Sequence, residues 1–369
     1  MNRFLLHAVF IFLGLILSAA NAQIMKSSFF RNSEIRSGLH YQSWSTAKDQ
    51  SISEFTVPLS FVVPVNKQLT LNIATSAASA SLNTASGSLG GLTDTRISGS
   101  YVTSNDKFLF TAGVFLPTGK TKLEDDQGAV ASALAFYPLN FRVPSFGQGL
   151  MANVSAIVAF ESRDFIWGGG LSYVYKNGFK PFANNDIQYV PGNELSANLG
   201  GETNIRKVKL TVDLTYTLYG KDTYDNTEIF KSGNKIIADI RALFRINAMD
   251  LMVYLRERTK GKNERGVGSL NTEEKNSNGN QLDFGGLGFY PISEVFGIKG
   301  LADIKFYSKN EYDNNGALLF GLGTGFNYKM SDHISFDILG KFSTGTLNNQ
   351  NLSTGITGIE FGGNIKYSL

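Results

Sequence analysis

The sequence predicts an all-β fold, a transmembrane antiparallel β-barrel of fourteen to sixteen strands with short periplasmic turns and long extracellular loops. Three features predict it. Apolar and polar residues alternate in runs of strand length, short connections alternate with long ones, and the N-terminus has the form of an export signal. The clearest alternating run extends from Leu210 to Leu218. Because successive strand side chains point to opposite faces, such a run has one apolar and one polar face.

Residues 1–22 are predicted to be a signal peptide. Arg3 precedes the apolar stretch from Phe4 to Leu17, and Ala20-Asn21-Ala22 supplies the small residues of a cleavage site. We expect a mature chain, residues 23–369, that forms a single outer-membrane β-barrel domain. The absence of cysteine excludes a lipoprotein anchor and a disulfide framework. No later segment approaches the roughly 20 apolar residues of a spanning helix.

The alternating runs predict sixteen strands. In chain order they are residues 37–45, 53–63, 67–76, 92–104, 107–117, 148–160, 164–176, 194–205, 207–219, 234–246, 248–258, 280–291, 295–307, 315–328, 333–343 and 354–367. Short turns are expected at Val65-Asn66, Asn105-Asp106, Ser162-Arg163, Arg206, Asn247, Ser293-Glu294 and Ser331-Asp332. The alternative for the first segment is a plug inside the lumen, which accounts for the range in strand number.

Charged residues within the runs are expected to face the lumen, because Arg or Lys on the lipid face costs about 2–4 kcal/mol at mid-membrane. Lipid-facing sets include Phe55, Val57, Leu59, Phe61 and Val63, and Ile236, Ala238, Ile240, Ala242, Phe244 and Ile246. The lumen-lining candidates are Asp94, Arg96, Asp213, Asp239, Arg241, Arg245, Asp250, Arg256, Asp283, Lys299, Asp303, Lys305, Asp337 and Lys341. Their mixed signs favour a mutually neutralising, solvated lining over a gate or an ion path.

Two further residue patterns concern the strands themselves. Pro58 lies in the middle of a run and has no amide proton, so it predicts a local defect in the hydrogen-bond ladder. Gly321, Gly323 and Gly325 share one phase, which either leaves room inside the barrel or allows strong coiling of the strand. We favour curvature as the explanation.

The third long connection, residues 118–147, is the candidate constriction or capture loop. It begins polar and turns apolar from Ala129 to Phe141, and a contiguous apolar surface indicates burial or binding. Three placements remain: inside the barrel, with a short helix before Pro138; outside, as a hydrophobic groove; or packed only on neighbouring segments as filler. The candidate substrate-binding residues are Ala129, Val130, Leu134, Phe136, Tyr137, Leu139 and Phe141.

Composition argues against several other classes. A net charge of +3 does not indicate nucleic-acid binding. Only His40 and His333 remain in the mature chain, and no spacing specifies a Ser–His site, so no catalytic site is predicted. Acidic loop clusters lack a metal-binding pattern, so no metal or cofactor is expected. Arg256, Arg258, Lys260, Lys262 and Arg265 form a basic rim, explained either by solvated loop charge or by contact with lipopolysaccharide phosphates.

Three short motifs carry a resemblance. Gly91-Leu92-Thr93-Asp94, Phe115-Leu116-Pro117-Thr118-Gly119-Lys120 and Tyr189-Val190-Pro191-Gly192-Asn193 resemble the outer-membrane transporter family associated with the meta-pathway of phenol degradation. That family is similar to the long-chain fatty-acid and aromatic-hydrocarbon channel superfamily. The resemblance implies a channel for poorly water-soluble molecules, in which residues 118–147 contribute to capture. This chain lacks an Asn-Pro-Ala plug signature between Gln23 and Arg36.

The sequence therefore predicts a non-enzymatic protein of the Gram-negative outer membrane, exported through the general secretory route. The expected function is passive uptake of small hydrophobic or aromatic compounds. A general diffusion porin and a non-transporting barrel, serving as an adhesin or assembly partner, are the alternatives. Expected partners are outer-membrane lipid and lipopolysaccharide, a small hydrophobic substrate, and the barrel-assembly machinery, because Glu360 to Tyr367 is similar to a closing-strand signal.

Overall fold

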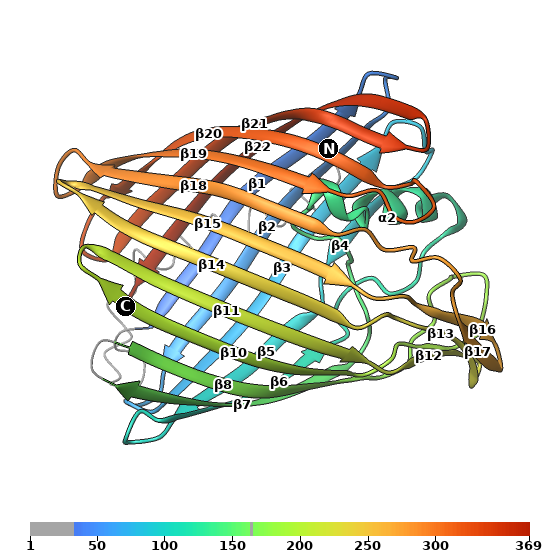
Figure 1. Ribbon diagram of the computed structural model, residues 1–369, viewed down its shortest axis with the longest axis horizontal. Helices are drawn as coiled ribbons and strands as arrows, with labels where there is room; N and C mark the ends of the chain where they lie inside the picture. Colours follow the sequence, from blue (N-terminus) through green and yellow to red (C-terminus); the bar gives the residue numbers. More distant parts are fainter. Residues whose placement is uncertain (1–32, 163–164) are drawn as a thin grey trace.

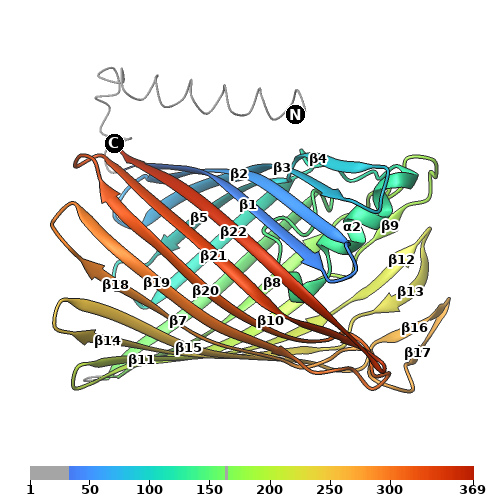
Figure 2. The same ribbon diagram turned by 90° about the horizontal axis from the view of Figure 1, so that it is seen from above.

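The computed structural model describes residues 33–162 and 165–369, and this part of the chain forms a closed antiparallel β-barrel (Figure 1, Figure 2). The barrel closes because β1 (Glu34–Thr46) pairs both with β2 (Ser51–Pro64) and with β22 (Leu352–Ser368). The first predicted strand is thus part of the wall and not a plug. The expected signal peptide lies outside the described residues, as does Arg163 of one expected turn.

The wall has sixteen strand positions, because β4 and β5 share one position and both pair with β3. The other wall strands are β3 (Leu69–Leu82), β4 (Ser88–Leu92), β5 (Thr95–Val102), β6 (Phe108–Leu116), β7 (Met151–Ser162), β8 (Phe165–Lys176), β10 (Glu194–Ile205), β11 (Val208–Tyr219), β14 (Lys235–Ile246), β15 (Met249–Lys260), β18 (Gln281–Pro291), β19 (Phe296–Tyr307), β20 (Gly316–Lys329) and β21 (Ile334–Asn349). The predicted fold class is confirmed, with a strand at each of the sixteen expected places.

The largest boundary difference among the early strands is in β3, which continues to Leu82 although its alternation of apolar and polar residues stops near Ser76. The extension consists of Ala and Ser, whose small side chains carry no period-two signal. It nevertheless pairs with β2 and β4, since strand pairing uses backbone groups.

The outer face of the barrel is apolar and exposed. In β14, Ile236, Ile240 and Ile246 are 45%, 40% and 50% exposed, while Asp239 of the opposite phase is 6% exposed. An exposed apolar band outside and buried charge inside is the arrangement of a membrane-spanning barrel. Period-two alternation thus places the polar half of each strand toward the lumen.

The short connections lie at one end of the barrel and the long ones at the other (Figure 1). Asp106, Arg206 and Asn247 in the short turns have φ of 56°, 57° and 54°, the left-handed conformation that tight hairpins use. Pro58 coincides with a gap in the β1–β2 pairing between Ser37↔Leu59 and His40↔Thr56, where the Ser37 hydroxyl donates to the Pro58 carbonyl at 2.8 Å.

The long loops add a second, small sheet beyond the barrel rim (Figure 1). Its strand order is β17-β16-β13-β12-β9, from β9 (Tyr189–Val190), β12 (Lys221–Tyr224), β13 (Thr227–Lys231), β16 (Glu264–Val267) and β17 (Ser269–Thr272). In the described part of the chain, the helices are η1 (Asp125–Gln127), α2 (Gly128–Leu134) and η2 (Tyr137–Leu139), all between β6 and β7. Within the described ranges, no helix has the length and hydropathy needed to cross a membrane.

Candidate functional site in the barrel lumen

Loop 3, the connection of residues 117–150 between β6 and β7, packs against the inner face of the barrel. Val130 and Leu134 lie four residues apart on one face of α2 and are 0% and 1% exposed. Figure 2 shows α2 beside β1 and β2. The wall residues of this apolar cluster are Trp44, Ile52, Ala78, Ala80, Leu89, Leu319 and Ile356. Trp44 and Ile52 are directly opposed on β1 and β2, in the phase away from the exposed Tyr41, so the cluster lies inside.

Two wall residues anchor the apolar part of loop 3. Glu54 of β2 is 1% exposed, and its carboxylate accepts the backbone N–H of Arg142 at 3.0 Å and of Val143 at 3.1 Å. Gln42 of β1, paired with Glu54 across the ladder, donates its Nε2 to the carbonyl of Leu139 at 2.8 Å. These bonds satisfy backbone groups that burial would otherwise leave unpaired, so they determine where the loop rests.

Asp94 joins the two ends of loop 3. Its carboxylate accepts the backbone N–H of Gly119 at 3.0 Å and of Gln148 at 2.7 Å. Next to it, Thr118 donates its hydroxyl to the Thr93 carbonyl at 2.9 Å. A Cβ at Gly119 would lie 2.1 Å from the Phe146 carbonyl oxygen, so only glycine fits there. The first two motifs of the sequence resemblance therefore contact each other at the base of this loop.

The residues expected to bind substrate divide into two groups. Val130, Leu134, Leu139 and Phe141 are buried in the cluster against the wall, and Phe136 packs at its border. Ala129 is exposed, while Tyr137 keeps 43% of its surface exposed. The loop is thus inside the barrel with a short helix before Pro138, and most of its apolar surface is used in packing. Tyr137 is the member of the set that lines the cavity of the lumen.

A cavity of about 670 Å³ lies between Tyr137 and the inner face of β8, β10, β11, β14 and β15. Its polar lining includes Arg241, Arg256 and Arg258, with Asp213, Asp239 and Glu202. Ala159, Ile166 and Ile237 contribute apolar surface, and Gly168, Gly170 and Gly200 leave the side near β8 and β10 open. The volume is within the range of small-molecule sites, roughly 300–1,000 Å³.

Most charges of this cavity are paired. Asp239 lies between Arg241 and Arg256, with carboxylate to Nε distances of 2.6 and 2.8 Å. Arg241 also contacts Asp213 through its Nη2 at 2.7 Å. Glu202, which the sequence prediction omitted, pairs with Lys209 at 2.7 Å. The lining therefore contains a connected row of ion pairs across β11, β14 and β15, and a separate pair between β10 and β11.

A second set of ion pairs lies across β19 to β22. Lys341 Nζ is 2.7 Å from Asp303 and 3.8 Å from Glu360, and both Lys341 and Asp303 side chains are less than a tenth exposed. A Cβ on Gly321 would lie 2.4 Å from Lys341 Cε and 2.7 Å from an Asp303 oxygen. Gly321 thus provides the space in which the pair meets, which is a more specific role than the curvature favoured from the sequence.

The other predicted lumen residues are distributed around the barrel. Lys299 pairs with Asp337, and Arg245 pairs with Asp250 at 3.0 Å. Asp283 and Lys305 are directly opposed on β18 and β19. Arg96 lies over the ring of Phe115 at 5.5 Å, apart from this network.

Besides Glu202 and its partner Lys209, the sequence prediction omitted three polar residues with a role at loop 3 or the ion pairs, Gln42, Glu54 and Glu360. Each occupies the polar phase of its run, since Tyr41, Phe55 and Phe361 face outward. Phase alone could have identified them as inward residues. It could not have identified their partners.

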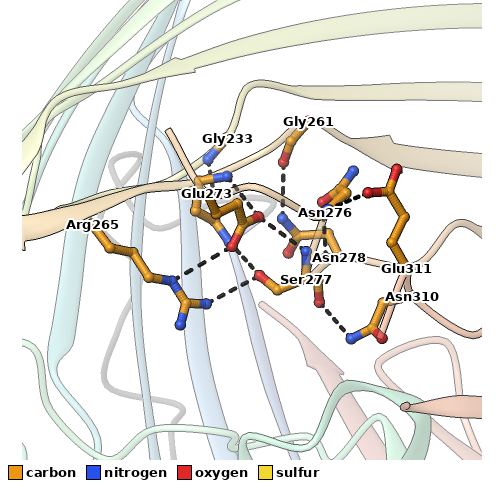
Figure 3. Close-up of polar contacts among 10 residues, drawn as sticks. Gly233, Gly261, Arg265, Glu273, Asn276, Ser277, Asn278, Asn310 and Glu311 are labelled. Carbon is orange, nitrogen blue, oxygen red and sulfur yellow. Dashed lines mark hydrogen bonds and ion pairs between the residues drawn. The ribbon is translucent and has the colours of Figure 1, made fainter. Parts of the chain in front are cut away.

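The outer loops form a dense polar network in which Arg265, Glu273 and Ser277 lie close together (Figure 3). Asn263, which is 3% exposed, is hydrogen-bonded into the same network. Asn263 Oδ1 accepts the N–H of Gly233, and its Nδ2 donates to the Ser277 hydroxyl, both at 2.9 Å. Glu273 accepts the N–H of Asn263 and of Ser277 at 2.9 and 3.0 Å. Burial raises the pKa of Glu273, but these hydrogen bonds and Arg265 outweigh it and hold the pKa below its ordinary value.

The third motif of the sequence resemblance holds two other loops together. Asp222 accepts the hydroxyl of Tyr189 at 2.6 Å and the N–H of Gly192 at 2.7 Å. Burial and the neighbouring Asp222 carboxylate raise the pKa of the Tyr189 phenol above its ordinary value, so it stays a donor. The loops at the outer rim are thus fixed by paired polar groups over the end of β15.

A closed barrel with an exposed apolar outer face, an ion-paired inner face and a partly filled lumen defines a transmembrane β-barrel of the outer-membrane type. The predicted location, the outer membrane of a Gram-negative bacterium, is confirmed by this architecture.

Several solved structures are similar to the chain. The TodX monoaromatic hydrocarbon channel, in its deltaS2 mutant, has 8% sequence identity and a TM-score of 0.50, covering 92% of this chain and 91% of that one. The outer membrane protein opdK from Pseudomonas aeruginosa has 9% identity and a TM-score of 0.47, covering 91% and 99%. A mutant porin from Rh. blastica has 13% identity and a TM-score of 0.41, covering 91% and 100%. No protein-family model and no curated protein sequence matches the chain. At these identities, the similarity shows the fold.

Proposed function

We propose that this protein is a passive outer-membrane channel for the uptake of small hydrophobic or aromatic compounds. The observation that carries the proposal is the inward position of loop 3, which narrows the lumen and presents the Tyr137 ring to a cavity of about 670 Å³. Ile166 and Ile237 supply apolar surface in the same cavity. An aromatic side chain and aliphatic groups around a few fixed polar groups are the usual lining of a small-molecule site. The TodX structure, a monoaromatic hydrocarbon channel by name, supports the same class of cargo.

The proposal assigns no catalytic residue, cofactor or metal ion. Its partners are membrane lipid and lipopolysaccharide around the barrel, the small substrate, and the barrel-assembly machinery. For the last of these we propose β22 as the recognised strand, since it contains the signal-like segment from Glu360 to Tyr367 and closes the barrel against β1.

A general diffusion porin is the second candidate, favoured by the extended row of ion pairs on the inner face. Such a polar, hydrated lining passes small hydrophilic solutes in porins. The two candidates differ in the role of loop 3. In the uptake channel, the aromatic ring that loop 3 brings into the lumen selects among solutes. A general diffusion porin passes solutes by size alone, without such selection.

Uptake into porin-deficient cells separates the two functions. Cells that express the protein are expected to accumulate a labelled monoaromatic such as toluene several-fold faster than vector controls, with arabinose uptake unchanged. Equal acceleration of arabinose, together with large and steady conductance in planar bilayers, would assign the protein to the porins instead.

A further inference from the structure

Arg258 differs from the other arginines of the cavity because it has no carboxylate partner. Arg241 and Arg256 pair with Asp213 and Asp239. The guanidinium carbon of Arg258 instead lies 3.8 Å from the centre of the Tyr137 ring. Among residues 33–162 and 165–369, no acceptor lies within hydrogen-bond or ion-pair distance of Arg258.

The charge balance of the cavity leaves Arg258 in surplus. The lining contains three arginines and three acidic residues. One of the acids, Glu202, is neutralised by Lys209, which is not part of the lining. Asp213 and Asp239 remain for Arg241 and Arg256, so one positive charge, that of Arg258, is uncompensated.

The stacked geometry leaves this charge available to a ligand. A guanidinium group is planar, and its N–H donors point outward in that plane. A ring against its face therefore occupies none of these donors. Two parallel donors match the two oxygens of a carboxylate. Ile237, directly opposite Arg258 on β14, and the exposed part of Tyr137 lie beside the same position and offer apolar surface.

Unpaired positive charge continues from Arg258 to the outer end of the barrel. Residues 256, 258 and 260 of β15 share the inward phase, because strand side chains alternate. Lys260 is directly opposite Lys235 on β14, and both ammonium groups lie near the Tyr219 ring, at 5.9 and 5.7 Å. Like charges in direct opposition destabilise a sheet. Three of the five residues expected to form an outer basic rim, Arg256, Arg258 and Lys260, thus face the lumen.

We infer that Arg258 and Tyr137 form a binding site for a small aromatic monocarboxylate, with Lys260 and Lys235 attracting the anion from the outer mouth. The carboxylate binds the free edge of the Arg258 guanidinium, and the ring of the ligand lies on Tyr137 and Ile237. This inference rests on the proposed channel function and narrows its substrate class from aromatic compounds in general to their anions.

The test compares benzoate with benzamide, which has nearly the same shape and no charge. Binding of each is measured by isothermal titration to the purified, detergent-solubilised full-length barrel, and permeation is measured in proteoliposomes. The native protein is expected to prefer benzoate in both assays. Arg258→Gln is expected to weaken benzoate binding roughly tenfold, the loss of a charge-assisted bidentate contact, with benzamide changed less than about twofold. Arg36→Gln is the matched control, because Arg36 lies near the start of β1 and is not part of the cavity lining. It should leave the binding of both ligands unchanged.

Two further variants separate recognition from attraction. Tyr137→Leu should weaken both ligands, since it removes the ring surface. Lys260→Gln should slow benzoate permeation and reduce its dependence on salt, with little effect on equilibrium binding, as expected of long-range attraction.

The possible outcomes are distinguishable. If benzoate and benzamide bind equally, or if Arg258→Gln leaves the preference for benzoate intact, the inferred site is wrong even when both compounds permeate and the channel function stands. If neither compound permeates but benzoate binding depends on Arg258, the site stands and the channel function fails.

Discussion

Replacing Glu54 with alanine tests whether one carboxylate holds loop 3 inside the barrel. Glu54 is 1% exposed and accepts the backbone N–H groups of Arg142 and Val143. Alanine leaves both donors without an acceptor, the Val143 N–H in a buried place and the Arg142 N–H in a partly buried one, at about 1–3 kcal/mol each. The lower bound of the sum, about 2 kcal/mol, corresponds to roughly 30-fold in an opening equilibrium.

Amide hydrogen exchange measured by mass spectrometry is the direct assay, because exchange of these amides requires local opening. Peptides that contain Arg142 and Val143 should exchange at least about 30-fold faster in Glu54→Ala than in the native protein. The wall strands should keep their protection, and the folded barrel should keep its mobility on unheated gels. Single-channel conductance should rise, since a displaced loop obstructs less of the lumen.

Glu202→Ala is the control for this experiment. It removes another carboxylate from the inner face, one that pairs with Lys209 and does not contact loop 3. Its exchange pattern in loop 3 should match the native protein. If Glu54→Ala also matched the native protein there, within about twofold, the loop would be held by its apolar packing and the reasoning from hydrogen bonds would be refuted.

Three further predictions concern the loops and the ion pairs. Gly119→Ala should strongly reduce the yield of folded barrel, because the added Cβ would lie 2.1 Å from the Phe146 carbonyl oxygen. Gly128→Ala, whose Cβ would have no atom within 4 Å, is the control and should keep the native yield. Equal yields of the two variants on unheated gels would contradict the close contact at Gly119. Gly321→Ala should crowd Lys341 and Asp303 and lower the free energy of unfolding by about 1–3 kcal/mol in urea titrations, the usual cost of overpacking, since both charged partners are retained. Gly300→Ala, with open space around it, is the control, and equal midpoints for the two variants would argue against the role of Gly321. Because the pKa of Glu273 is lowered, its contribution to loop stability is complete above the ordinary glutamate pKa and is lost as the pH falls through the lowered value. Protection of residues 263–277 from hydrogen exchange should therefore fall at acidic pH in the native protein. It should change less with pH in Glu273→Gln.

The strand pattern was predictable because it is a local property. Alternation along each strand requires only that one face meet lipid and the other the lumen, so the phase of Asp239, Arg241 and Arg256 could be assigned without knowing any neighbour. The defect at Pro58 was predictable for another local reason, since proline has no amide proton, and the pairing of β1 with β2 is interrupted there. The five short strands of the outer sheet were not predicted, since runs of two to five residues carry too little periodicity.

The position of loop 3 was not predictable to the same degree. Its apolar composition required burial but was equally compatible with the inside of the barrel, an outer groove and packing among loops. The choice depends on Glu54 and Gln42, which lie on strands far away in the sequence and reach the backbone of the loop only when the barrel is closed.

The sequence by itself determined that this chain is a barrel with an apolar exterior and a charged interior, because strand periodicity and the cost of charge in lipid act residue by residue. Tertiary structure decided which charges cancel and which remain. Lys341 finds Asp303 because Gly321 leaves the space between them, and Arg258 is left with the ring of Tyr137 because loop 3 folds back to it. Such pairings depend on strand register and on contacts between distant segments, which a single strand does not encode.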